Sequence, residues 1–352
     1  MYPCVNINIK KINDNIKKIK DICKKNNIKF NIVLKVLSGN YDIVKKINFK
    51  NVDSISDSRL DNLKKYSDIK KEKWLIRMPS FSEIKDTIKY SDVSFNSSLD
   101  TIKLLNEEAK KQKKKHKVIL MYELGDLREG ADYSYLSMIS SEVVKLSNIE
   151  LYGIGANLTC YGGIAPSEEN TEELYDVKNA IEYENDLKFN IISGANSSSF
   201  KLLEEGKLKN KMNYVRFGES VFLGMIPGYY EKIDSLNQDS FVLCAQISEI
   251  FEKPSYPKGE ILKNSFGETP HFEDIGYRIR ALINIGKQDT GLGLKPVDEN
   301  INILDGSSDY LILDITDSNK DYKVGDVIEF IPDYESLLKV MTSSYVRKNI
   351  VK

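Results

Sequence analysis

Histidine is scarce in this sequence. The chain of 352 residues contains only two, His116 and His271, and they are far apart. Zinc sites and Ser-His-Asp triads both depend on imidazole groups, so this chain offers little material for either. We therefore expect no metal site and no serine-hydrolase chemistry.

Cysteine is sparse as well. The four cysteines are Cys4, Cys23, Cys160 and Cys244. No two of them have the spacing of a metal site or a redox pair, which favours a reducing cytoplasm.

Strong charge and long apolar runs are both missing. The net charge is −1, which gives no electrostatic case for a nucleic-acid or membrane partner. The basic run "KKQKKKHK" (residues 110–117) lies where a helix should end and a strand should begin, and we interpret it as a solvated helix face. No segment approaches the ~20 apolar residues of a membrane span. Residues 1–11 lack the hydrophobic region of a signal peptide.

The first two thirds of the chain alternate between short apolar runs and helical patterns. In residues 10–27 the apolar side chains recur at three- and four-residue steps, which predicts a helix. Eight runs are typical of strands, namely residues 31–36, 54–58, 73–78, 93–97, 117–124, 151–158, 190–196 and 214–220. Eight alternating units predict a parallel (β/α)8 barrel over residues 9–232.

The pattern changes after residue 232. Four strand-like stretches follow, separated by Gly, Pro, Asp and Asn: residues 241–254, 278–286, 301–315 and 324–332. Few helical stripes occur among them. We therefore predict a second, mostly-β domain over residues 233–352, which the short N-terminal strand in residues 1–8 joins.

Polar residues and one glycine lie at or just after the carboxyl ends of the predicted barrel strands, where such barrels carry their catalytic residues. They are Lys35, Arg128, Asn157, Asn196, Arg216, Gly218 and Glu219. Lys35 comes directly after a buried run, and an unpaired buried charge costs several kcal/mol (roughly). Lys35 therefore either reaches water or has its amine covalently occupied.

The last two predicted strand ends are suited to an anion. "SGANSSSF" offers hydroxyl groups and backbone N–H groups, and "RFGES" offers a glycine where a phosphate could approach closely. Taken alone, "NSSS" is equally a helix cap. Together with Lys35, these loops favour pyridoxal 5′-phosphate, which needs an amine and a phosphate socket.

These motifs resemble the alanine-racemase-like family of pyridoxal-phosphate enzymes. The resemblance runs through "VLKVLSGN", "LGDLREG", "GIGANLTCYG", "SGANSSS", "VRFGES" and "IGKQDTG", in that order and over nearly the whole chain. The segments "NLTCYG", "NSSS" and "SSDYLILDITDSN" are most similar to the ornithine racemase branch. The resemblance implies a barrel with a β domain, and head-to-tail homodimers.

The resemblance also assigns roles to individual residues. Lys35 matches the lysine that binds the cofactor covalently, Arg216 the arginine at the pyridine nitrogen, and Arg128 the arginine beside the phenolic oxygen. The remaining cofactor-binding residues that we assign are Asn157, Asn196, Ser197, Ser198, Gly218, Glu219 and Tyr334. Without the resemblance, Arg128 is equally a surface arginine paired with Asp126 or Glu129.

Three positions depart from the family pattern. The tyrosine that helps to hold the phosphate is displaced to Tyr41 in "VLSGNYD", and Asn157 stands where the family has a histidine. Lys287, in "IGKQDTG", occupies the position of the partner subunit's tyrosine base. Lys287 becomes a base if desolvation lowers its pKa, and it is equally interpreted as a surface lysine. The alternative second bases are Cys160, Tyr161, His271 and Tyr334.

Three single residues have simpler interpretations. His271 is expected in a loop or an interface, and Trp74 on the outer face of its strand. Arg77 either points into the barrel mouth or pairs with Asp57 or Glu123.

The sequence thus predicts an amino-acid racemase acting on a small-molecule substrate, most simply ornithine. Alanine or broad-specificity racemisation is the nearest alternative. A decarboxylase is disfavoured because Cys244 lies inside a predicted strand, and a metal-dependent aldolase because no histidine follows His271. A cofactor-carrier protein would be a lone barrel without the β domain. For the δ-amine of ornithine, the sequence offers Glu123, Asp126 and Asp289 without choosing among them.

Overall fold

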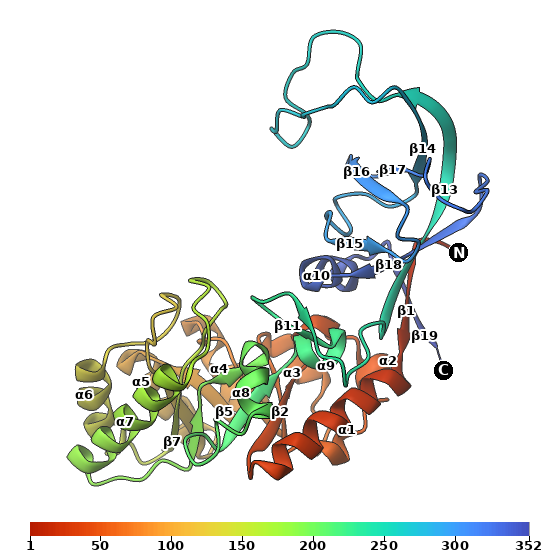
Figure 1. The fold of residues 1–352 in the computed structure, drawn as a ribbon. Coiled ribbons are helices and arrows are strands. Elements are labelled where there is room, and N and C mark those ends of the chain that lie inside the picture. Colours follow the sequence, from red (N-terminus) through yellow and green to blue (C-terminus); the bar gives the residue numbers. More distant parts are fainter. Residues whose placement is uncertain (352) are drawn as a thin grey trace. The chain divides into compact units, whose positions relative to one another are not determined.

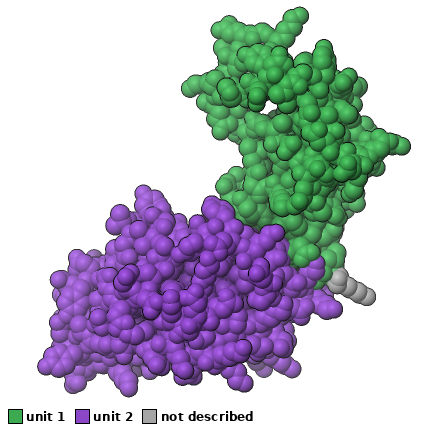
Figure 2. Space-filling model, in the orientation of Figure 1, with its two compact units in different colours: residues 1–8, 239–352 green, residues 9–238 purple. Residues whose placement is uncertain are grey.

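The computed structural model describes residues 1–351, which form two compact units (Figures 1 and 2). The barrel unit comprises residues 9–238, and the β unit comprises residues 1–8 together with 239–352. The division falls after Gln238, whereas the sequence prediction placed it after Lys232. Within residues 1–351, no helix combines the length and apolar composition needed to cross a membrane.

The barrel unit is built on one parallel sheet. Its strands are β2 (Lys29–Val33), β3 (Ser54–Asp57), β4 (Glu72–Leu75), β5 (Val93–Asn96), β6 (His116–Met121), β7 (Ile149–Gly155), β8 (Ile191–Ser193), β9 (Ala195–Asn196) and β10 (Tyr214–Phe217). They follow the order β8-β7-β6-β5-β4-β3-β2-β10-β9. Only Gly194 separates β8 from β9, and both lie beside β10, so the pair fills a single strand position. The predicted eight-stranded barrel is confirmed.

Helices connect these strands and cover the outside of the sheet (Figure 1). They are α1 (Ile9–Lys25), α2 (Tyr41–Val44), α3 (Leu60–Lys65), α4 (Ile84–Tyr90), α5 (Leu99–Lys111), α6 (Tyr133–Val143), α7 (Glu168–Asn185), α8 (Phe200–Glu204) and α9 (Glu219–Leu223). Short 3-10 turns are η1 (Lys35–Leu37), η2 (Phe49–Asn51), η3 (Phe81–Glu83) and η4 (Ser197–Ser199), and a small hairpin pairs β11 (Met225–Ile226) with β12 (Glu231–Lys232).

Helix α1 forms as its apolar spacing predicts. Ile12, Ile16, Ile19 and Cys23 are all fully buried. The lysines between them face solvent, and Lys24 and Lys25 in the last turn are favourable at the negative end of the helix dipole.

Aromatic side chains fill the barrel interior. Trp74 on β4 is fully buried, and its ring centroid lies 4.7 Å from that of Tyr214 and 6.0 Å from that of Phe95. In the sheet, β3 and β2 separate β4 from β10, so the Trp74–Tyr214 contact crosses the barrel. The predicted outer-face position of Trp74 is therefore wrong.

Within residues 1–351, the β unit is a mostly antiparallel sheet, in which only β1 and β19 pair in parallel, together with one helix. Its elements are β1 (Cys4–Asn8), β13 (Phe241–Pro254), β14 (Tyr277–Ile283), β15 (Leu294–Pro296), β16 (Asn302–Gly306), β17 (Leu311–Asp314), β18 (Val327–Pro332), α10 (Tyr334–Thr342) and β19 (Arg347–Val351). The order is β15-β18-β13-β14-β17-β16, and β1 pairs with β13 and β19. The predicted mostly-β character is confirmed, and β1 lies in this sheet beside β13 and β19.

Trp74 provides a test of the barrel interior. Replacing Trp74 with alanine should lower the free energy of unfolding by about 3–5 kcal/mol, because a large fully buried ring is lost. Urea unfolding followed by circular dichroism measures the change. Phe81→Ala is the matched control, since Phe81 is 65% exposed and should shift stability by less than about 0.5 kcal/mol. Equal shifts in the two variants would place Trp74 outside the core.

Candidate active site

Lys35 begins turn η1, two residues after β2 ends. The Leu34 N–H still donates to the Ser56 carbonyl at 2.8 Å, which holds the chain beside β3 up to that point. Asp57, the last residue of β3, is fully buried. Burial raises the pKa of Asp57 to about 6, and the nearby positive charge of Lys35 opposes that rise. The amine of Lys35 therefore lies within electrostatic reach of a buried carboxyl group at the barrel mouth.

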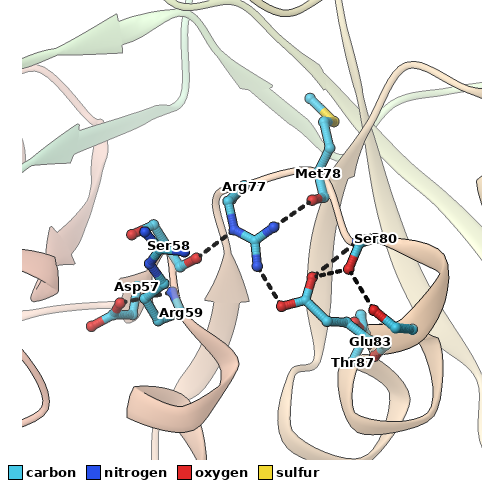
Figure 3. Close-up of polar contacts among 9 residues, drawn as sticks. Asp57, Ser58, Arg59, Arg77, Met78, Ser80, Glu83 and Thr87 are labelled. Atoms are coloured by element: carbon cyan, nitrogen blue, oxygen red, sulfur yellow. Dashed lines mark hydrogen bonds and ion pairs between the residues drawn. The ribbon is translucent and has the colours of Figure 1, made fainter.

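Asp57 is held by its own loop and not by Arg77. Its Oδ1 accepts from the Arg59 N–H at 2.9 Å, and Asn62 Nδ2 donates to both carboxyl oxygens at 3.1 and 3.2 Å. Arg77 instead pairs with Glu83 at 2.5 Å and donates to the Ser58 carbonyl at 3.0 Å (Figure 3). The predicted pairing of Arg77 with Asp57 or Glu123 is wrong.

Ser197 and Gly218 join two strand ends. The Ser197 Oγ accepts from the N–H groups of Gly218 and Ser220, both at 3.2 Å. Two accepted bonds leave its hydroxyl proton to be donated to an anion. A Cβ on Gly218 would lie 3.2 Å from the Val33 carbonyl oxygen, so glycine allows β10 to pack closely against the end of β2, beside Lys35. Glu219 follows as the first residue of α9.

Asn196 links the loops after β7 and β9. Its Nδ2 donates to Asn157 Oδ1 at 3.2 Å and to the Leu158 carbonyl at 2.8 Å. Its Oδ1 accepts from Ser198 N–H at 3.0 Å and from Ser198 Oγ at 2.5 Å, which caps η4. Asn157 Nδ2 is buried and has no hydrogen-bond partner among the described residues.

Arg216 lies inside the barrel. Its Nη1 donates to the Oγ and the carbonyl of Ser193, the Oγ at 2.7 Å, and its Nη2 donates to the Ala156 carbonyl at 2.7 Å. The guanidinium carbon lies 5.0 Å from the centroid of the Phe95 ring. Burial lowers the pKa of Arg216 to about 10, so the group stays charged at neutral pH.

Arg128 forms an ion pair with Glu129, the next residue in the chain. Its Nε and Nη2 donate to the two carboxyl oxygens of Glu129, which raises the pKa of Arg128, and it also hydrogen-bonds Cys160. Cys160 Sγ lies 3.9 Å from Asn196 Nδ2. The loop carrying Arg128 thus meets the loops carrying Cys160 and Asn196.

The remaining candidates belong to other elements of the chain. Tyr41 starts α2, and its hydroxyl donates to Asp68. In the β unit, Lys287 Nζ lies 2.5 Å from Asp305 and 3.4 Å from Glu268, and the Asp305 hydrogen bond raises the pKa of Lys287. Tyr334 is the first residue of α10.

Three of the alternative second bases, Cys160, Tyr161 and His271, lie in exposed loops. Tyr161 is exposed in the loop after β7, next to Cys160, which is also exposed. His271 is an exposed residue in the long connection between β13 and β14, a loop position as predicted.

The residues at the barrel mouth fit pyridoxal phosphate. An amine stands just after the end of β2. The hydroxyl proton of Ser197 lies at η4, where its Oγ already accepts the N–H groups of Gly218 and Ser220, and the guanidinium of Arg216 projects from β10. The unpartnered Nδ2 of Asn157 is the most specific observation, because a buried amide N–H without an acceptor is costly unless a ligand supplies one. No group of three or more His, Cys, Asp or Glu side chains that could hold a metal ion occurs within residues 1–351.

Sequence reasoning missed the environment of Lys35. The sequence pattern indicates Asp57 only as a partner for Arg77, and nothing in it points to Asn62. The signal available was a carboxylate at the end of an otherwise apolar strand, "SISD", because such a group requires donors close by.

A barrel with strand-end groups of this kind, followed by a β domain, defines a fold class that known proteins share. Residues 7–225 match the family model "Alanine racemase, N-terminal domain". An ornithine racemase of Acetoanaerobium sticklandii is 46% identical over 353 residues, covering 100% of both chains. A lysine racemase of Thermotoga maritima is 35% identical, covering 99% of this chain and 98% of its own.

The fold agrees with these relatives. The crystal structure of alanine racemase from Bartonella henselae with covalently bound pyridoxal phosphate superposes with a TM-score of 0.75 over 100% of both chains, at 15% identity. The chain therefore belongs to the alanine racemase family, and it is an amino-acid racemase of that family.

The pKa of Asp57 predicts a specific pH dependence of stability. In the folded state it is about 6 against the ordinary 3.8, so the contribution of Asp57 to stability is present below about pH 4 and is lost as the pH rises through 6. Asp57→Asn removes this titration. Relative to the parent protein, the variant should gain up to about 3 kcal/mol between pH 4 and pH 7.5.

Urea unfolding of the cofactor-free protein at these two pH values measures the gain. Asp61→Asn, on the exposed side of α3, serves as the matched control and should change little at either pH. A difference between Asp57→Asn and the parent that is the same at both pH values would contradict the assignment.

Proposed function

We propose that this protein is a pyridoxal-phosphate-dependent racemase that interconverts L- and D-ornithine. The observation that carries the cofactor proposal is the buried, unpartnered Nδ2 of Asn157, which lies on the loop that Asn196 joins to the Ser197 turn. Ornithine is favoured because the 46% identical ornithine racemase is matched from end to end.

Lys35 has two tasks in this proposal. Its amine would hold the cofactor covalently and, when free, would remove the proton from Cα on one face. When bound, pyridoxal phosphate supplies the conjugated ring that takes up the electron pair left on Cα. Asp57, which is bonded to Asn62 and Arg59, sets the electric field around that amine.

The other barrel residues bind and orient. Ser197 Oγ and the Gly218 and Glu219 backbone would hold the phosphate, with Ser198 and Asn196 keeping η4 in place. Arg216 would donate to the pyridine nitrogen and, as a permanent cation, keep that nitrogen unprotonated. Arg128 would lie beside the phenolic oxygen, and Tyr334 would contribute a hydroxyl from the β unit.

Lys287 is the proposed acid and base for the opposite face of Cα. Its ion pairs with Asp305 and Glu268 raise its pKa, so in the resting enzyme it holds a proton that it can donate to Cα. The sequence prediction required the opposite, a pKa lowered by desolvation. In the proposed cycle Lys287 begins as the acid, and it becomes a base only after that donation.

Two further proposals concern the assembled enzyme. A head-to-tail homodimer, in which one subunit supplies Lys287 to the site of the other, follows from the family resemblance. A cytoplasmic location is favoured by the four free thiols of Cys4, Cys23, Cys160 and Cys244.

The function is tested with purified protein, added pyridoxal phosphate, and L-ornithine, L-lysine or L-alanine. We expect inversion of ornithine with exchange of its Cα proton for deuterium, measured by chiral chromatography and mass spectrometry. Lys35→Ala should lose this activity, by at least about 1,000-fold. After borohydride reduction, the cofactor should be found on the peptide that contains Lys35 in the parent protein.

Lys29→Ala is the matched control, because Lys29 lies at the other end of β2 and is exposed. It should keep both the activity and the labelled peptide. Inversion of alanine in preference to ornithine would instead indicate an alanine racemase, and release of carbon dioxide or an aldehyde a lyase. Labelling of a lysine other than Lys35 would contradict the assignment.

Mixed dimers test the role of Lys287. Lys35→Ala and Lys287→Ala subunits should each be nearly inactive, and after denaturation and joint refolding they should recover about one quarter of the parent activity. Random pairing makes about half of the refolded dimers hybrids, which contain one subunit of each variant. Each hybrid has one intact active site out of two. Sedimentation measures the dimer, and Lys295→Ala, which changes an exposed lysine of the β unit, is the control. Recovery no greater than the sum of the two separate variants would exclude exchange of Lys287 between subunits.

A further inference from the structure

Asp126 is a buried carboxylate in the loop between β6 and α6. It is only 2% exposed. Its Oδ2 accepts from the Tyr161 N–H at 3.0 Å, and its carbonyl accepts from the Gly162 N–H at 3.0 Å. A Cβ on Gly162 would lie 2.8 Å from that carbonyl oxygen, so glycine is what allows the loop after β7 to press against Asp126.

The second carboxyl oxygen of Asp126 is unsatisfied. Its Oδ1 is buried and has no hydrogen-bond partner among the described residues, and no ion pair of Asp126 occurs within that part of the chain. Arg128, two residues further on, gives its guanidinium to Glu129 instead. Burying a carboxylate with half of its acceptors empty costs several kcal/mol (roughly), so the group calls for a cationic partner.

Glu123 and Asp289, the other two carboxylates considered for a substrate amine, each accept hydrogen bonds. Glu123 Oε1 accepts from the N–H groups of Gly125 and Leu127 at 2.6 and 3.0 Å, and so shapes the same loop. In the β unit, Asp289 accepts from Ser343 Oγ at 2.6 Å. Of these three carboxylates, Asp126 is the one with a buried oxygen that lacks a hydrogen-bond partner among the described residues.

Asp126 also lies next to the candidate cofactor site. Tyr161, which donates to it, follows Cys160, and Cys160 contacts both Arg128 and Asn196. A substrate whose Cα stands over the cofactor would direct a side chain of a few carbons toward the loops that line the barrel mouth.

We propose that Asp126 binds the terminal ammonium group of a diamino-acid substrate and thereby selects ornithine over uncharged amino acids. This proposal rests on the proposed function. Because Oδ1 has no solvent contact, the loop must shift for the ammonium group to reach it. Leu127 and Tyr161 flank the position and are each 74% exposed, so neither side chain is locked in the core.

The test compares Asp126→Asn with the parent holoenzyme on two substrates. L-Norvaline has the same carbon chain as ornithine without the ammonium group. For ornithine, kcat/KM should fall by about 10- to 100-fold, mostly through a higher KM, because a hydrogen bond to a charged group is lost. For norvaline it should stay within about twofold. Asp132→Asn is the matched control, since asparagine caps α6 as well as aspartate does.

The outcomes distinguish failure of the Asp126 role from failure of the proposed racemase function. Unchanged discrimination between ornithine and norvaline, or an equal loss on both substrates, would overturn the role of Asp126 while leaving the racemase intact. A parent enzyme that racemises neither substrate would overturn the proposed function, and with it this inference.

A second variant covers the case in which Asp126→Asn does not fold. Asp126→Glu keeps the charge and extends it by one methylene group, so it should shift preference from ornithine toward 2,4-diaminobutanoate, which is one carbon shorter. The opposite shift, or no shift, would contradict direct contact with the ammonium group.

Discussion

A guanidinium group inside the barrel ties three strand ends together, and the site depends on it. Arg216 projects from β10 and donates to Ser193 at the end of β8 and to the Ala156 carbonyl just beyond β7. A buried cation needs acceptors, and the carbonyl groups that end parallel strands need donors, so each satisfies the other. The loops that carry Asn157 and Asn196 therefore start from fixed points.

Two buried carboxylates at this mouth show how differently the same group can be used. Asp57 receives donors from Arg59 and Asn62 and lies beside the positive charge of Lys35, so its place is settled within the chain. Asp126 receives one backbone donor and keeps an open oxygen. A buried carboxylate with all its hydrogen bonds made holds the surrounding loop in place. A buried carboxylate with an unpaired oxygen destabilises the fold unless a ligand supplies the missing donor.

The sequence could predict the barrel and much of the site, because carboxyl ends of parallel strands meet at one edge and Lys35, Ser197 and Arg216 all follow apolar runs. It could not tell inside from outside for Trp74, since barrel strands are buried on both faces and show no alternation. Helix α7 escaped notice because only Thr171, Leu174 and Ile181 are buried along its length. The ion-pair partner of a single charged residue, such as Asp305 for Lys287, is set by the tertiary structure. It leaves no periodic pattern in the sequence.

The two proposed catalytic amines have different electrostatic surroundings. This difference can affect kcat and KM separately for the two enantiomers, but not their ratio. Lys287 faces the carboxylates of Asp305 and Glu268, whereas Lys35 lies near the buried Asp57. The two carboxylates raise the pKa of Lys287 and so hold it in its protonated form. Enantiomers have equal free energy in water, so kcat/KM must be the same in both directions whatever the two amines do. The difference between the two amines can therefore appear only in the separate values of kcat and KM. The enantiomer whose Cα proton faces Lys287 would have a different kcat and a different KM from its mirror image.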